Sequence, residues 1–101
     1  MPEEWIALMS DLLSALKIDL GMTTTAYDER LMQYIKSSYE AIMEEGITLN
    51  SASMKDQQLV ILYSAWMWRR RDSGEGMPRM IRYALNNRLL SEKMKRVRTD
   101  E

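Results

Sequence analysis

The sequence contains neither cysteine nor histidine. Without cysteine the chain has no disulfides, thiolate metal sites or cysteine nucleophiles, and without histidine it lacks the commonest general base and zinc ligand. Carboxylates remain, but no spaced pair of acids is embedded in apolar residues, as general acid–base catalysis would require. We therefore expect no enzyme activity, no metal site and no cofactor.

Long apolar runs are missing as well. No stretch approaches the roughly 20 apolar residues of a membrane span. The start, MPEEW, is acidic and lacks the order of a signal peptide, and neither end carries a lipidation motif. We therefore expect a cytosolic address and no membrane partner. At 101 residues the chain is expected to form a single domain, with a flexible C-terminal end from about residue 94 to 101.

The most apolar stretch is LVILYSAWMWRRR, which runs from Leu59 to Arg71. One set of its residues follows helical spacing and forms a core-facing stripe: Leu59, Leu62, Tyr63, Trp66 and Met67. A second set lies off that stripe: Val60, Ile61, Ala65 and Trp68. This helix is therefore apolar nearly all round and needs cover on two sides. Because a chain of this length is short for both, we expect another subunit to bury part of the helix.

Hydrophobic periodicity predicts an all-α bundle of about four principal helices. They are expected from about Glu3 to Lys17, from Ala26 to Glu45, from the Ser53 cap to about Asp72, and from Pro78 to about Arg96. The expected inward residues of the first, second and fourth helices are Trp5, Leu8, Leu12 and Leu16, then Tyr27, Leu31, Ile35, Ser38 and Ile42, then Met77, Ile81, Ala84, Leu85 and Leu89. The break DSGEG, from Asp72 to Gly76, is short enough to fold the fourth helix back against the third.

Two patterns resemble capping boxes with aspartate in place of glutamate. Thr25 with Asp28 is expected to open the second helix, and Ser53 with Asp56 the third. Between these helices, Ile47 to Asn50 alternates apolar and polar residues and suits a short extended piece.

The two halves of the chain carry opposite charge. Residues 1–50 hold three bases and nine acids, a net charge of −6, and residues 51–101 hold eleven bases and six acids, a net charge of +5. Such asymmetry suits head-to-tail association of copies into a ring. The alternative is that the two halves pair within one chain.

Ten methionines contrast with the absence of phenylalanine. The flexible thioether fills irregular gaps in a core and also suits surfaces that repack against several neighbours. The sequence leaves both interpretations open.

The hinge between the third and fourth helices is rich in arginine. Six arginines flank it: Arg69, Arg70, Arg71, Arg79, Arg82 and Arg88. Guanidinium groups grip phosphates or carboxylates in bidentate fashion, so these residues suit subunit contacts, salt bridges or DNA. A helix-turn-helix reading would place Met77, Pro78 and Arg79 against the bases, which is a poor reading set. Asn86 and Asn87, adjacent amides within the fourth helix, are either surface residues or hydrogen-bond donors to a neighbouring chain.

Two blocks of the sequence carry a family resemblance. The first, TTTAYDERLMQYIKSSYEAIMEEGI, runs from Thr23 to Ile47, and the second, LVILYSAWMWRRRDSGEGMPRMIRYALNNRLLSEK, runs from Leu59 to Lys93. They resemble the small all-helical head-tail connector (adaptor) proteins of tailed bacteriophages and prophages. The second block is the more specific, because generic helical bundles seldom combine WMWRRR, a glycine-containing hinge and MPRMIRYALNNRL.

The resemblance implies a structural virion protein at the head-tail junction, located in the host cytoplasm before assembly. Proteins of this family form a ring beneath the portal, extend the DNA channel and offer a docking surface to the next connector or tail component. The implied partners are other copies of the chain in a homo-oligomeric ring, dodecameric in the virion, the portal protein, the next head-tail or tail component, and channel DNA bound without sequence preference.

The resemblance also implies roles for residues. Trp66, Trp68 and the helix from Met77 to Leu90 would belong to subunit packing, and the basic residues would face neighbours, the portal or DNA. From the residues alone, the alternative function is a small DNA-binding regulator that uses the helix-turn-helix-like segment 59–90.

Overall fold

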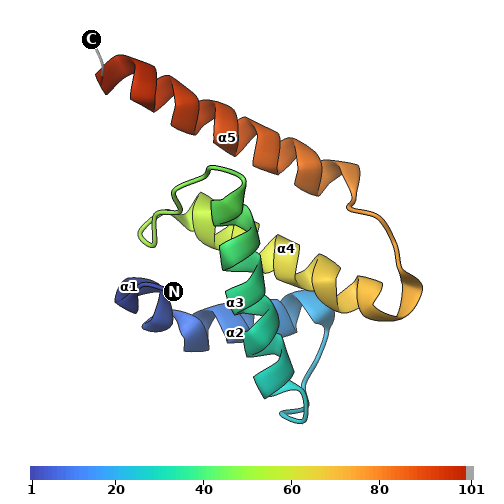
Figure 1. Cartoon of the computed structure of the whole chain (residues 1–101). Coiled ribbons are helices and arrows are strands. Elements are labelled where there is room, and N and C mark those ends of the chain that lie inside the picture. Colours follow the sequence, from blue (N-terminus) through green and yellow to red (C-terminus); the bar gives the residue numbers. More distant parts are fainter. Residues whose placement is uncertain (100–101) are drawn as a thin grey trace.

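The computed structural model describes residues 1–99, which form five α-helices around one core (Figure 1). The helices are α1 (Glu3–Ile6), α2 (Met9–Leu20), α3 (Asp28–Glu44), α4 (Met54–Ser73) and α5 (Arg79–Thr99). No strand occurs among these residues. The prediction of an all-α fold is therefore confirmed. Among the described residues, no helix has both the length and the apolarity needed to cross a membrane.

The predicted first helix is divided into α1 and α2, which makes five helices instead of about four. At the break, the Leu8 N–H donates to the carbonyl of Trp5, three residues back, over 3.1 Å. This tighter turn bends the chain and buries Trp5, whose ring centroid lies 5.4 Å from that of Tyr39 on α3. The division therefore follows from the packing of one aromatic side chain. It could not be read from the periodicity.

The predicted cap at Thr25 does not form. The N-terminal capping position of α3 is Tyr27, and it makes no side-chain hydrogen bond to the helix. Asp28 instead accepts a hydrogen bond from the Lys17 ammonium over 2.8 Å, which ties the start of α3 to the end of α2. Tyr27, predicted to face the core, is 47% exposed and lies edge-on to Trp68 with ring centroids 5.2 Å apart.

The predicted cap at Ser53 is confirmed. Its hydroxyl accepts a hydrogen bond from the Asp56 N–H over 3.3 Å at the start of α4. The Asp56 carboxylate does not complete a capping box, because it accepts from the Asn50 N–H over 2.8 Å and from Arg88 on α5. Before this turn, Ile47 and Leu49 point into the core from a segment without regular structure.

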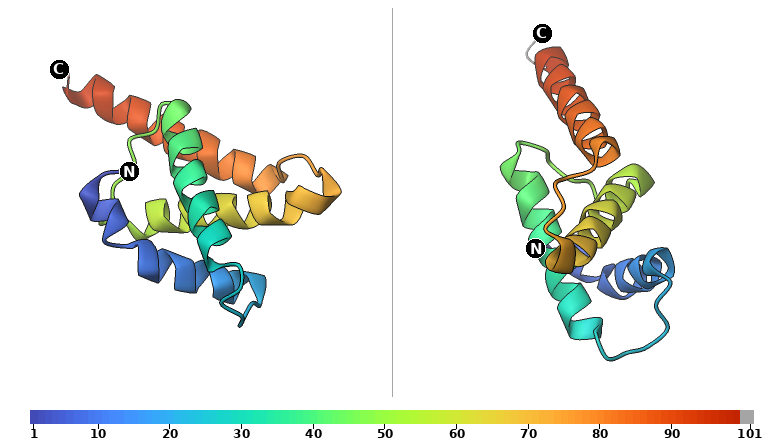
Figure 2. Two further views of the ribbon diagram at one scale, coloured as in Figure 1. Left: turned by 60° about the horizontal axis from the view of Figure 1, so that its bottom comes forward. Right: turned by 90° about the vertical axis from the view of Figure 1, so that its right-hand side faces the viewer.

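Helix α4 runs through the middle of the molecule (Figure 2). It contacts α2, α3 and α5, and these neighbours bury the residues that lie off its main stripe: Val60, Ile61, Ala65 and Trp68. The expectation that another subunit must cover this helix is therefore wrong. The periodicity correctly predicted that α4 is apolar nearly all round. The cover comes from three helices of the same chain and not from a second subunit.

Two buried serines lie where α3 crosses α4. The Ser64 hydroxyl lies 2.9 Å from that of Ser38 and donates to the Val60 carbonyl over 2.7 Å, while the Ser38 hydroxyl lies 3.3 Å from the Met67 sulfur. Both serines are fully buried, and their small side chains let the two helices approach closely. Their polar atoms are satisfied within the contact, so the crossing leaves no unpaired donor.

Six of the ten methionines pack against the core: Met1, Met9, Met22, Met43, Met67 and Met77. The Met1 side chain is only 2% exposed, whereas Met54, Met80 and Met94 are exposed. The buried core consists of leucine, isoleucine, valine, alanine, tryptophan and tyrosine. The methionines therefore serve both roles, since six pack against the core and three lie on the surface.

Helix α5 packs on the remaining side of α4 through Ile81 and Leu85. Its C-terminal half extends past the other helices (Figure 1). The longest dimension of the whole molecule is 51 Å. The segment expected to be flexible, 94–101, is helical as far as Thr99, and residues 100–101 lie outside the described part of the chain.

One prediction concerns alkaline pH. Burial raises the pKa of the Tyr39 phenol above its usual value, and the nearby carboxylates of Glu40 and Glu4 raise it further. Between the two pKa values the folded chain holds a proton that the unfolded chain releases, so stability is full below about pH 10 and falls as the pH rises further. Tyr39→Phe should therefore lose less stability than the wild type between about pH 9 and pH 11, as measured by urea unfolding.

A residual alkaline slope is expected in that variant, because burial also raises the pKa of Tyr63. Identical slopes for wild type and variant would contradict the prediction for Tyr39.

Candidate assembly interface

The ten residues predicted to lie at a subunit or partner interface come from two elements. Trp66, Trp68, Arg69, Arg70 and Arg71 lie in the last two turns of α4, and Arg79, Arg82, Asn86, Asn87 and Arg88 lie on α5. The linker 74–78 joins the two groups, and it begins at Gly74, whose φ of 66° ends α4 in the left-handed conformation. The structure places these residues in four different settings.

Both tryptophans are buried within the chain. Trp66 is 9% exposed, and its indole N–H donates to the Gly76 carbonyl over 3.1 Å, which attaches the linker to α4. Trp68 is 8% exposed and meets the rings of Tyr27 and Tyr34 edge-on, with centroids 5.2 and 6.3 Å away. Little of either ring is left for a second chain.

Three arginines make local contacts at the surface. Arg69 lies 3.4 Å from the Asp19 carboxylate of α2, and Arg82 lies 2.7 Å from the Glu45 carboxylate at the end of α3. The Arg71 guanidinium stacks on the Trp68 ring, 3.5 Å from its centroid, and donates to the Trp68 carbonyl over 2.6 Å. Exposed ion pairs of this kind contribute about 0–1 kcal/mol each.

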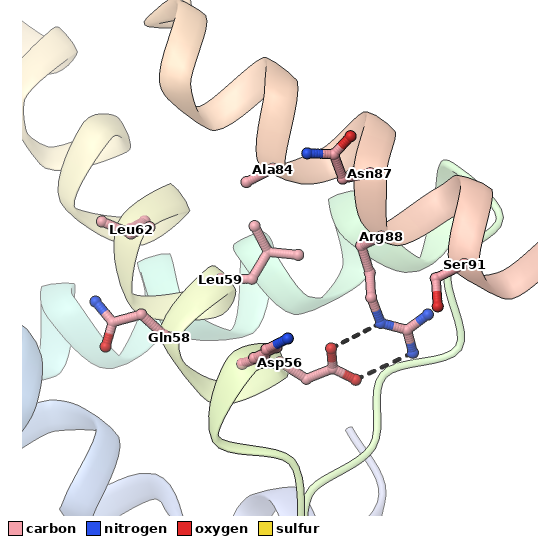
Figure 3. A pocket seen from close by; sticks show the side chains of 9 residues that line it. Asp56, Gln58, Leu59, Leu62, Ala84, Asn87, Arg88 and Ser91 are labelled. Atoms are coloured by element: carbon pink, nitrogen blue, oxygen red, sulfur yellow. Dashed lines mark hydrogen bonds and ion pairs between the residues drawn. The ribbon is translucent and has the colours of Figure 1, made fainter.

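Arg88 makes the strongest polar contact in the chain (Figure 3). Its Nε and Nη2 donate to the two Asp56 carboxylate oxygens over 2.7 and 3.1 Å, and Nη2 also donates to the Thr48 carbonyl over 2.8 Å. Nη1 donates to Glu92 one turn along α5 over 2.9 Å. Asp56 is only 2% exposed, and the hydrogen bond to it raises the pKa of Arg88 above its usual value. Arg88 therefore fastens α5 to the start of α4 and is not available to a partner.

Half of the predicted polar residues have no ion pair or side-chain hydrogen bond in the described chain. Arg70 lies over the Trp66 ring, 4.6 Å from its centroid, with its head group exposed. Arg79 is exposed and has no ion-pair partner in the described chain, and the side chains of Asn86 and Asn87 make no hydrogen bond there. A partner could contact these four without breaking an ion pair or a side-chain hydrogen bond in the described chain.

Sequence reasoning missed the most exposed apolar surface of the molecule, which lies on α5. We call it the outer α5 face, and it consists of Met80, Tyr83, Asn87, Leu90, Met94 and Val97. Its five apolar members are between 52% and 82% exposed. The apolar residues of this face recur in the sequence at alternating steps of three and four residues. The inward stripe of the same helix was recognised instead.

Hollows follow the outer α5 face along the helix. The first, of about 410 Å³, lies between α4 and α5 and is lined by Leu59, Leu62, Ala84, Asn87 and Ser91 among others (Figure 3). The next two, of about 270 and 360 Å³, lie on α5 itself around Leu90 and Met94. Each hollow shares residues with the next, so together they form one shallow apolar groove.

The charges on the surface are only partly paired inside the chain. The pairs Arg69–Asp19 and Arg82–Glu45 join the acidic half to the basic half, as the intramolecular alternative requires. On α1 and α2, however, Glu3, Glu4 and Asp11 are exposed and make no ion pair in the described chain. Among residues 1–99, no group of three or more carboxylates is arranged to hold a metal ion.

Comparisons with known proteins return no relative. No protein-family model, no curated protein and no solved structure matches the chain. The resemblance to head-tail connectors therefore rests on the two sequence blocks alone.

Proposed function

We propose that this chain is a structural subunit of a phage-type head-tail connector (adaptor), a ring that docks beneath a portal, extends its DNA channel and joins head to tail. The observation that carries the proposal is that exposed acids and exposed cations without ion-pair partners in the described chain lie on opposite edges of the molecule. The resemblance of the two sequence blocks adds the virion context.

Helices α1 and α2 form one of these edges, and α5 forms the other. In Figures 1 and 2, α2 and α5 lie on opposite sides of α4, and α3 crosses α2 and α4. Glu3, Glu4 and Asp11 on the first edge, and Arg79 and Lys93 on α5, are exposed and make no ion pair in the described chain. A surface that complements the opposite side of an identical copy forms heterologous contacts, which close into a ring when the rotation between copies allows it.

The proposed mechanism is geometric. Identical contacts repeat around the ring, and complementary charge sets the order and orientation of subunits more than it sets affinity. The lumen of such a ring passes DNA, and spare cations such as Arg70 and Arg79 suit contact with phosphates that is independent of base sequence.

The alternative function, a DNA-binding regulator, has less support from the geometry. Four of the six arginines that motivated this alternative already have partners within the chain: Arg69, Arg71, Arg82 and Arg88. A salt-sensitive mobility shift of short duplex DNA by a monomeric protein would favour it.

The direct test of the ring is native mass, measured by light scattering on a sizing column over a range of protein concentrations at low and high salt. We expect a closed oligomer of defined mass whose population grows with concentration and falls with added salt. A strict monomer at every concentration in both salts would contradict the proposal.

A charge-reversal variant tests the electrostatic part. Arg70→Glu with Arg79→Glu replaces two exposed cations, neither of which makes an ion pair in the described chain. The loss of the Arg70 contact with Trp66 should cost about 0.5–1 kcal/mol of stability, so the monomer stays folded. We expect association to weaken by an order of magnitude or more, as followed by light scattering. Unchanged assembly would show that these charges do not set the contact.

A further inference from the structure

Helix α5 has two apolar faces on opposite sides. Ile81, Leu85 and Leu89 face α4 and the core, while the outer α5 face points away from the molecule. Since an α-helix turns about 100° per residue, the centres of the two sets lie roughly half a turn apart. An exposed helix face this apolar marks a contact with another helix or protein.

The spacing of the outer α5 face specifies the kind of contact. Its members are separated by three, four, three, four and three residues, the pattern of the a and d positions in a coiled coil. The single Asn87 at an a-type position is a device that fixes register at some cost in stability. The occupant of this face is therefore expected to be another helix that packs side chains between those of α5.

The hollows on α5 have the shape that such packing needs. In a coiled coil, each inserted side chain fits between four residues of the facing helix. Leu90, Lys93, Met94 and Val97 surround one hollow at relative positions 0, 3, 4 and 7. Asn87, Leu90, Ser91 and Met94 surround the preceding hollow at the same relative positions. Two successive acceptor sites for side chains of a partner helix thus lie open.

A second α5 is a poor occupant on electrostatic grounds. The exposed Arg79 and Lys93 flank the outer α5 face, and neither makes an ion pair in the described chain. Pairing two α5 helices would bring helices with seven bases and one acid side by side, and like charges in contact cost stability. The groove therefore favours a helix that carries acids.

The same chain offers an acidic helical surface on its opposite edge. We call it the outer α2 face, and it consists of the exposed residues Ala7, Ser10, Asp11, Ser14 and Ile18. Its side chains are mostly small, which lets a helix with large side chains approach closely. Glu3 and Glu4 extend the acidic charge at its start, and α2 alone spans about 18 Å of the roughly 26 Å that the outer α5 face covers.

We infer that the outer α5 face of one copy packs against the outer α2 face of the next copy, and that this contact repeats around the ring. The inference rests on the proposed ring and names its interface. Arg79 and Lys93 of one chain meet Glu3, Glu4 and Asp11 of the next, and Leu90 and Met94 lie on the small residues of α2.

Engineered cysteines test the contact, because the chain contains none of its own. Ser10→Cys, Ser14→Cys and Leu90→Cys are all at exposed positions and leave the core intact. Under mild oxidation, the double variants Ser10→Cys with Leu90→Cys and Ser14→Cys with Leu90→Cys sample two registers one turn apart. At least one should give a ladder of covalent oligomers on a non-reducing gel, whereas each single variant should stay monomeric. Gln33→Cys with Leu90→Cys, which places one cysteine on the exposed side of α3, is the matched control and should give no ladder.

The outcomes separate this inference from the ring itself, whose native mass is measured on the same samples. A defined oligomer without a ladder from either double variant would overturn the interface and leave the ring standing. Covalent dimers from Leu90→Cys alone would overturn the interface in favour of paired α5 helices. A monomer without a ladder would overturn both, and a ladder without a closed ring would support the interface against the ring.

A charge variant gives an independent reading. Leu90→Glu with Met94→Glu should weaken association at least tenfold, because it adds two acids opposite an acidic surface, while urea unfolding stays close to that of the wild type. Gln33→Glu with Ser37→Glu adds the same charge at exposed positions one turn apart on α3 and should leave association unchanged. Equal association in the two variants would overturn the inference.

Discussion

Arg88→Met is expected to lower the free energy of unfolding by about 3–5 kcal/mol, since removing one partner of a buried ion pair leaves the other charge without compensation. Asp56 is 2% exposed and receives two of its hydrogen bonds from Arg88, at 2.7 and 3.1 Å. A chain of this length has a total stability of roughly 5–15 kcal/mol, so the loss is a large fraction of it. Urea unfolding at a concentration where the monomer dominates would measure it.

Two further variants make this result specific. Arg82→Met removes the exposed ion pair with Glu45 from the same helix and should cost only about 0–1 kcal/mol. Arg88→Met with Asp56→Asn should be more stable than Arg88→Met alone, because the amide no longer leaves a buried charge and can still accept from the Asn50 N–H. A loss below about 1 kcal/mol in Arg88→Met would mean that water reaches Asp56.

Trp66→Ala is the second large effect, with an expected loss of about 3–5 kcal/mol from the cavity that it creates. Trp66 is 9% exposed, its ring lies edge-on to Tyr63, and its N–H holds the Gly76 carbonyl. Trp66→Phe loses the hydrogen bond and part of the ring volume but keeps most of the packing, so it should cost clearly less than Trp66→Ala.

The variant distinguishes two roles for this residue. A side chain that serves only subunit contact would leave the stability of the monomer unchanged when it is truncated. We expect the opposite, a clear loss measured by urea unfolding at low protein concentration. If the stability of Trp66→Ala equals that of the wild type, Trp66 serves subunit contact, as the sequence suggested.

Most of the fold could be predicted because helical periodicity and helix ends are local signals. Leu12, Leu16, Leu31, Ile35, Ile81 and Leu85 are buried as their spacing predicts. Gly46 and Gly74 have positive φ next to the expected ends of the second and third helices, whereas α2 runs to Leu20, past the expected end at Lys17. The break at Leu8 was missed because it depends on the contact of Trp5 with a ring on another helix.

The candidate site was predicted less well, because pairing across the fold has no local signal. Asp56 read as a capping residue, although its carboxylate meets Arg88, 32 positions along the chain. Periodicity showed that α4 needs cover on several sides, but it could not say whether the same chain provides it. The outer α5 face was readable as a spacing of three and four, yet only the structure shows that nothing in the described chain covers it.

The placement of the methionines bears on how the protein responds to oxidants. Conversion of a thioether to the sulfoxide makes an apolar side chain polar, and solvent-exposed methionines are the accessible ones. The methionines that pack against the core, such as Met67, are less accessible to this chemistry. Met80 and Met94, in contrast, lie on the outer α5 face and are 82% and 52% exposed. Oxidation would therefore weaken the proposed contact between subunits before it lowered the stability of a single subunit.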